Sequence, residues 1–63
     1  MRIEYGWYPQ HNIWAIYAVD KGVTKEFEYA GNIETARFIV RNYCKKYNTK
    51  LVIRINGKEK RDE

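Results

Sequence analysis

The sequence predicts a small α+β domain: a three-stranded antiparallel meander, one helix packed on one face, and a fourth, C-terminal strand that joins the sheet. Residues 2–8 and 25–29 alternate apolar and polar side chains with the period of two that is typical of strands, and residues 13–19 between them form a β-branched and aromatic run. Residues 33–47 change to the 3.6-residue period of an amphipathic helix, and residues 51–55 return to a strand pattern. A chain of 63 residues allows one domain. We expect this domain to cover residues 1–57 and a polar tail to follow over residues 58–63.

The first two strands are expected at residues 2–8 and 13–19. Pro9 ends the first strand because proline cannot donate a hydrogen bond to a β-ladder, and residues 10–12 form the turn. The second strand is β-branched and aromatic, and both of its faces are apolar: Trp14, Ile16 and Ala18 form one, and Ile13, Ala15, Tyr17 and Val19 the other. Two apolar faces predict a central position in the sheet.

The third strand is expected at residues 25–29, after a hairpin turn at Asp20-Lys21-Gly22. Its glutamates, Glu26 and Glu28, are expected on the face of the sheet away from the helix. The fourth strand is expected at residues 51–55, parallel to the third and beside the first. We expect Val52 and Arg54 to point outward from this strand and the aliphatic residues Leu51, Ile53 and Ile55 to face inward. A turn at Asn56-Gly57 is expected to follow it.

Capping residues bound the predicted helix. The side-chain oxygen of Asn32 can accept a hydrogen bond from a free N–H group of the first turn. Glu34 suits the positive end of the helix dipole, and Lys45 and Lys46 suit the negative end. Asn48 can adopt the left-handed conformation that ends a helix.

Composition excludes several classes of function. Serine is absent, which removes serine nucleophiles, and the single cysteine cannot form an intrachain disulfide. Cys44 lies on the apolar arc of the predicted helix and His11 in a distant turn, so no pair of nucleophile and base, and no metal site, can be assembled. No apolar run approaches the length of a membrane span, and the first residues, Met-Arg-Ile-Glu-Tyr, lack the apolar core expected of a signal peptide. We therefore expect a cytoplasmic, non-enzymatic protein without a cofactor.

The positive charge is concentrated in the predicted helix. The chain carries a net charge of +4, and residues 33–50 alone account for +4. The polar arc of the helix has an aromatic residue in its middle, and the predicted contact patch is Arg37, Phe38, Arg41, Lys45 and Lys46. With nucleic acid, the cations would neutralise phosphates and the ring would stack on an unpaired base. With an acidic protein, the ring would be an anchor and the cations its steering rim. We predict nucleic-acid binding, and the acidic protein stays open as an alternative partner.

The face of the sheet opposite the helix offers a second surface. One helix covers one face, so we expect the other face to present Tyr8, Tyr17, Val19, Val52 and Arg54. An apolar face without a second layer usually meets a partner, and a second copy is the simplest partner for a short chain. The alternative function is therefore a homodimeric protein–protein interaction module that uses this aromatic face or a sheet edge. A stacking platform for single strands, built from strand aromatics, is a further alternative: Tyr5, Trp7, Tyr8, Trp14 and Tyr17.

Several short motifs resemble a family of short, mostly bacterial domains of unknown function. The matching residues are Trp14-Ala15-Ile16, Gly22, Glu34-Thr35-Ala36, Leu51-Val52-Ile53 and Asn56-Gly57-Lys58. The resemblance covers about residues 3–60 and implies the same order of strands and helix, with no activity attached. Here Ala36 is the single alanine of the helix, where that family tends to have several.

The order of three strands followed by a helix is also similar to that of the DNA-binding domains of plant AP2-type factors and of the arm-binding domains of phage integrases. In those domains the sheet enters the major groove, and arginine and tryptophan read the bases. The first 32 residues here carry a net charge of −1, with Glu26 and Glu28 on one strand face. The charge therefore favours a contact through the helix over a contact through the sheet.

Overall fold

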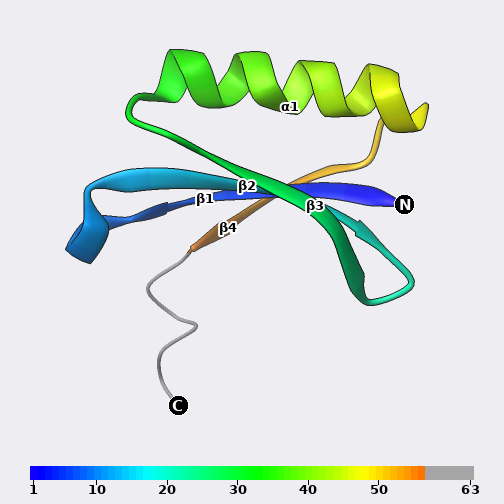
Figure 1. The fold of residues 1–63 in the computed structure, drawn as a ribbon, viewed down its shortest axis with the longest axis horizontal. Helices are drawn as coiled ribbons and strands as arrows, with labels where there is room; N and C mark the ends of the chain where they lie inside the picture. The colour runs from blue at the N-terminus through cyan, green and yellow to red at the C-terminus, as the bar shows by residue number, and fades with distance from the viewer. Residues whose placement is uncertain (57–63) are drawn as a thin grey trace.

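A computed structural model describes residues 1–56 as a four-stranded sheet with one helix across one of its faces (Figure 1). The elements are β1 (Arg2–Tyr8), the 3₁₀ turn η1 (Pro9–His11), β2 (Ile13–Asp20), β3 (Val23–Ala30), α1 (Ile33–Tyr47) and β4 (Val52–Asn56). The predicted α+β fold is confirmed. The predicted turn at Gly57 and the polar tail over residues 58–63 lie outside the described residues.

The strand order across the sheet is β3-β2-β1-β4. The pairs β1–β2 and β2–β3 are antiparallel, and β4 pairs in parallel with β1. β2 therefore occupies the central position that its two apolar faces predicted. The fourth strand lies beside the first, as predicted, and runs in the same direction as β3.

Residues with positive φ make the two reversals of the meander. Lys21 and Gly22 have φ values of 53° and 80°. A positive φ at both central residues is what a type I′ hairpin requires, and this turn matches the twist of the strands that it joins. Asn12, with φ of 52°, ends η1 and donates its N–H to the carbonyl oxygen of Pro9 at 3.1 Å.

Both predicted caps bound α1. The side chain of Asn32 accepts a hydrogen bond of 2.8 Å from the N–H of Thr35. Asn48 has φ of 53°, and its N–H donates to the carbonyl oxygen of Lys45. The helix therefore begins and ends at the residues that the sequence predicted.

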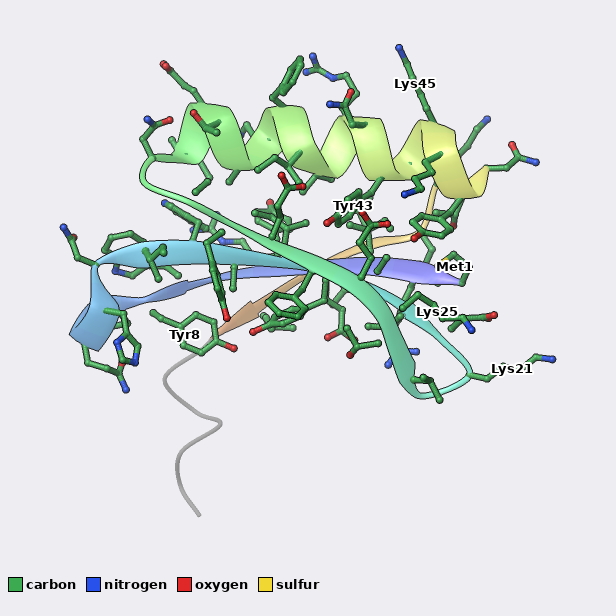
Figure 2. All side chains as sticks on the ribbon, viewed as in Figure 1. Met1, Tyr8, Lys21, Lys25, Tyr43 and Lys45 are labelled. Atoms are coloured by element: carbon green, nitrogen blue, oxygen red, sulfur yellow. The ribbon has the colours of Figure 1, made fainter. Side chains whose placement is uncertain are left out.

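The core lies between α1 and the sheet. Tyr43 points from the helix toward the strands, whereas Tyr8 points away on the far side (Figure 2). The helix packs mainly over β2, β1 and β3. The buried residues of this layer are Ile3, Trp14, Ile16, Ala18, Ala30, Ala36, Ile39 and Tyr43.

Candidate functional site

The outward side of α1 carries a row of cations with one aromatic ring, which we call the helix arc: Arg37, Phe38, Arg41 and Lys45. All four residues are exposed, and the side chain of Lys45 points away from the sheet (Figure 2). Phe38 is 59% exposed. The prediction that this ring lies outside the core is confirmed.

Lys46, which we predicted in the same patch, contacts the sheet instead. Its ammonium nitrogen lies 2.7 Å from Oε1 of Glu26, and the hydroxyl of Tyr47 donates to the same oxygen. These hydrogen bonds lower the pKa of the Glu26 carboxyl and raise the pKa of Lys46 and of Tyr47. The charge of Lys46 is thus neutralised locally, and Lys46 does not belong to the helix arc.

The cations of the helix arc have no ion-pair partner within residues 1–56. The ion pairs in that range join Met1 to Asp20, Arg2 to Glu4 and Lys46 to Glu26. Arg37, Arg41 and Lys45 therefore present three positive charges along one helix that form no ion pair with any residue of 1–56.

The second candidate surface is the face of the sheet away from α1, which no other element of residues 1–56 covers (Figure 1). Phe27 and Tyr29 are 54% and 56% exposed there, and Ile53 is 37% exposed. We call this surface the open sheet face, and its main residues are Tyr8, Ile13, Tyr17, Phe27, Tyr29 and Ile53. Val19 also lies on this side but is 7% exposed, so it adds little contact area.

Aromatic rings form a continuous row across the open sheet face. The ring centroids of Tyr17 and Phe27 are 6.4 Å apart, and those of Phe27 and Tyr29 are 5.5 Å apart. The hydroxyl of Tyr17 donates to the hydroxyl of Tyr8 at 3.4 Å. Burial, and then this hydrogen bond, raise the pKa of Tyr17, so its phenol stays neutral.

The faces of β3 are the reverse of our prediction. We expected Glu26 and Glu28 on the open side, but they lie beside Ala18 and Ile16, on the helix side. The cause is a register shift: Val19 pairs with Thr24 while Ala18 pairs with Glu26, so Lys25 is an extra residue in β3. A one-residue shift exchanges the two faces of a strand. Phe27 and Tyr29 are thereby turned outward, beside Tyr17 and Ala15.

The faces of β4 also differ from our prediction. We expected Val52 and Arg54 on the open face, but they pair with Ile3 and Tyr5, which lie on the helix side. The guanidinium of Arg54 lies 5.9 Å from the ring centre of Tyr5 and 5.2 Å from that of Trp14. This cation–π contact is possible because β4 lies at the sheet edge, outside the strands over which the helix mainly packs.

Gly6 explains how β4 can place Ile55 on the open side. A Cβ atom at Gly6 would lie 2.5 Å from the carbonyl oxygen of Ile55 and 2.7 Å from its Cγ1. The missing side chain therefore gives β4 its close approach to β1. Phe27, Tyr29 and Ile53 are the open-face residues that sequence reasoning missed, because the register shift in β3 and the pairing of β4 with β1 decide which way they point.

An open hollow of about 420 Å³ lies at the η1 end of the open sheet face. Tyr17 and Tyr29 line it beside the exposed ring of Phe27. The remaining lining residues are Tyr8, His11, Ile13 and Ala15. The lining is aromatic and aliphatic, apart from three phenol hydroxyls and one imidazole, which suits an apolar group such as an aromatic side chain.

The predicted stacking platform does not form as one surface. Trp7 and Trp14 lie 5.5 Å apart on the helix side together with Tyr5, whereas Tyr8 and Tyr17 lie on the open side. The five rings are therefore divided between two faces of the sheet.

The residues with chemical reactivity do not meet. Cys44 packs against the core from α1, and His11 lines the hollow on the other side of the sheet. Within residues 1–56, no group of three or more His, Cys, Asp or Glu side chains is placed to hold a metal ion. In the same range, no helix combines the length and the apolar character that a membrane crossing needs.

Comparisons with protein-family models, with curated proteins and with solved structures find no match for this chain. The resemblance to short domains of unknown function stays a prediction.

Proposed function

We propose that the protein binds nucleic acid through the helix arc and favours strands with unpaired bases. The observation that carries this proposal is the combination of three cations without an ion-pair partner in residues 1–56 and the 59% exposed ring of Phe38 among them. Arginine and lysine supply the phosphate contacts that dominate affinity for nucleic acid.

The spacing of the cations suits a linear polyanion. Arg37, Arg41 and Lys45 recur every four residues, so they follow one side of the helix at steps of about 6 Å along its axis. Phe38 lies three residues before Arg41 and is its neighbour on the helix surface. A strand that runs along this row can place phosphates on the cations and one base on the ring.

The ring is the reason to prefer unpaired bases. A base within a duplex is already stacked on both sides, whereas an unpaired base can stack on an exposed aromatic side chain, which contributes about 1–3 kcal/mol. An acidic peptide would satisfy the cations, but a single-stranded nucleic acid offers a planar base beside every phosphate, so one base can always reach Phe38.

Fluorescence anisotropy with a labelled single-stranded oligonucleotide and the same sequence as a duplex tests the proposal. Three phosphate contacts predict a slope of about −2 for log K against log salt with single strands. This slope corresponds to roughly a 20-fold loss of affinity between about 50 mM and about 200 mM salt. Absence of binding at low salt, or binding to polyglutamate without binding to either oligonucleotide, would contradict the proposal.

Matched variants locate the contact. Lys45→Gln should weaken binding and flatten the salt slope by about 0.7, whereas Lys21→Gln, at the hairpin tip (Figure 2), should change neither. Phe38→Ala should weaken binding to single strands about tenfold, and Phe27→Ala, an equally exposed ring on the other layer, should not. Equal losses in the two members of either pair would show that the helix arc is not the contact.

A further inference from the structure

We propose that two copies of the chain associate through the open sheet face, with Phe27 of each copy seated in the hollow of the other. The inference does not depend on nucleic-acid binding. It rests on the charge of the face, on its shape and on its area.

The charge of the open sheet face permits self-association. Arg2 and Glu4 lie on this side and neutralise each other through a contact of 2.6 Å. The other main residues of the face are uncharged. Lys25 lines a neighbouring hollow with Phe27 and Tyr29, but it is a single cation, so the repulsion between two copies is small. The helix arc, with three cations that lack an ion-pair partner within residues 1–56, would repel its own copy. The open sheet face also lacks such a row of cations, and it therefore fits a second copy better than it fits a polyanion.

The shape of the face is complementary to itself. Phe27 protrudes with 54% of its surface exposed. The rings of Tyr17 and Tyr29 flank Phe27, and the same two rings line the hollow, so the hollow lies directly beside Phe27. In a two-fold interface the same patch serves both subunits, so a protruding group beside a hollow meets the hollow of the partner copy. The hollow of about 420 Å³ has room for a phenyl ring.

The area of the face predicts a weak dimer. Four strands at a spacing of about 4.8 Å, with about seven residues each at about 3.3 Å, give a projected face of roughly 450 Å². Two such faces bury about 900–1,000 Å², which is at the lower limit for a specific interface. We therefore expect a dissociation constant in the micromolar range, not the nanomolar range.

The arrangement has one geometric consequence. Two sheets packed face to face would have a helix on each outer side, and the two helix arcs would point in opposite directions. If the proposed nucleic-acid contact holds, the dimer presents two separate sites for strands.

Sedimentation equilibrium from about 1 µM to about 1 mM protein, in about 0.5 M salt and without nucleic acid, tests this inference. We expect a monomer–dimer equilibrium that persists at this salt, because burial of apolar surface drives it. Phe27→Glu should weaken the dimer about 100-fold or more, since it places a carboxylate in an apolar hollow. The matched variant Phe38→Glu, with the same change on the opposite layer, should leave the dimer intact.

Two further measurements keep the result unambiguous. Far-UV circular dichroism checks that Phe27→Glu is folded, and Tyr29→Lys on the same face serves as a second disrupting variant. In a mixture of isotope-labelled and unlabelled protein, NMR should show intermolecular contacts between the Phe27 ring and the Ile13 methyl groups. A monomer at about 1 mM, or a dimer that Phe27→Glu does not weaken, would overturn the inference. Because no nucleic acid is present, either result leaves the helix-arc proposal to its own experiment.

Discussion

The ammonium group of Lys46 lies 2.7 Å from a carboxylate oxygen of Glu26, and this ion pair joins the last turn of α1 to β3. Tyr47 donates its hydroxyl to the same oxygen. One carboxylate thus holds two consecutive helical residues against the sheet. It also explains why a glutamate can lie on the helix side of an edge strand.

The Glu26 carboxyl should make the stability of the folded protein depend on pH. Hydrogen bonds from Lys46 and Tyr47 lower its pKa below the ordinary value of 4.5. A lowered pKa in the folded state contributes stability above the unfolded-state pKa, and this stability is lost as pH falls through the folded-state pKa. Glu26→Gln should therefore lower the Tm near neutral pH, and the difference from wild type should shrink below about pH 4.

Thermal melts of wild type and Glu26→Gln from about pH 7 to about pH 2 measure this difference. Glu28→Gln is the control, because it removes a carboxylate from the same strand face without breaking an ion pair within residues 1–56. A constant difference across the whole range would mean that the Glu26 contact is absent in solution.

Gly6→Ala should displace β4 from β1. The added Cβ would lie 2.5 Å from the carbonyl oxygen of Ile55, so the strands must separate locally. We expect the free energy of unfolding to fall by about 1–3 kcal/mol in urea titrations. Gly31→Ala is the matched control, since a Cβ there meets no atom within 4 Å. A Gly6→Ala variant as stable as Gly31→Ala would contradict the close approach of the two strands.

Tyr43→Phe should be neutral or stabilising. The Tyr43 hydroxyl is buried and makes no hydrogen bond of normal geometry within the described structure. Burial is the main cause that raises its pKa, and the nearby carboxylates of Glu26 and Glu28 raise it further. Removing a buried unsatisfied hydroxyl should raise the free energy of unfolding by up to about 1 kcal/mol. Tyr47→Phe removes a hydroxyl that donates to Glu26, and its Tm should fall. Chemical denaturation of both variants should separate them, and a clear loss in Tyr43→Phe would indicate a partner for that hydroxyl.

Asn32→Ala should weaken the start of α1. The Asn32 side chain accepts the N–H of Thr35, and loss of an N-cap residue costs about 1 kcal/mol. Asn42→Ala, at an exposed position within the helix, should be neutral or slightly stabilising because alanine has the higher helix propensity. The urea concentration at the midpoint of unfolding should therefore be lower for Asn32→Ala than for Asn42→Ala, and equal midpoints would argue against the cap.

Much of the fold was predictable because its signals are local. The limits of β1 and α1, the caps Asn32 and Asn48, and the hairpin at Lys21-Gly22 follow from residue types over a few positions. The central place of β2 follows from its two apolar faces. The exposure of Phe38 follows in the same way from the helical period.

The orientation of the edge strands was not predictable from these signals. The two-residue turn sets Asp20 opposite Val23, and an unbroken ladder from there would place Phe27 beside Ile16 in the core. The extra residue Lys25 reverses this assignment, and the sequence around it carries no mark of a bulge. In β4 the aliphatic residues were assigned to the core, but this strand lies at the edge and its phase is set by pairing with β1.

The sequence by itself determined the elements of this protein, their order, the helix caps and the concentration of positive charge on one helix. Tertiary structure alone decided which side chains each edge strand turns outward, so that Phe27, Tyr29 and Ile53 join the open sheet face. It also decided that Lys46 pairs with Glu26 and does not belong to the helix arc. The physical reason is the range of the interactions. Capping, turn and periodicity preferences act within a few residues, whereas strand register and the Lys46–Glu26 pair depend on contacts between segments that are distant in the chain.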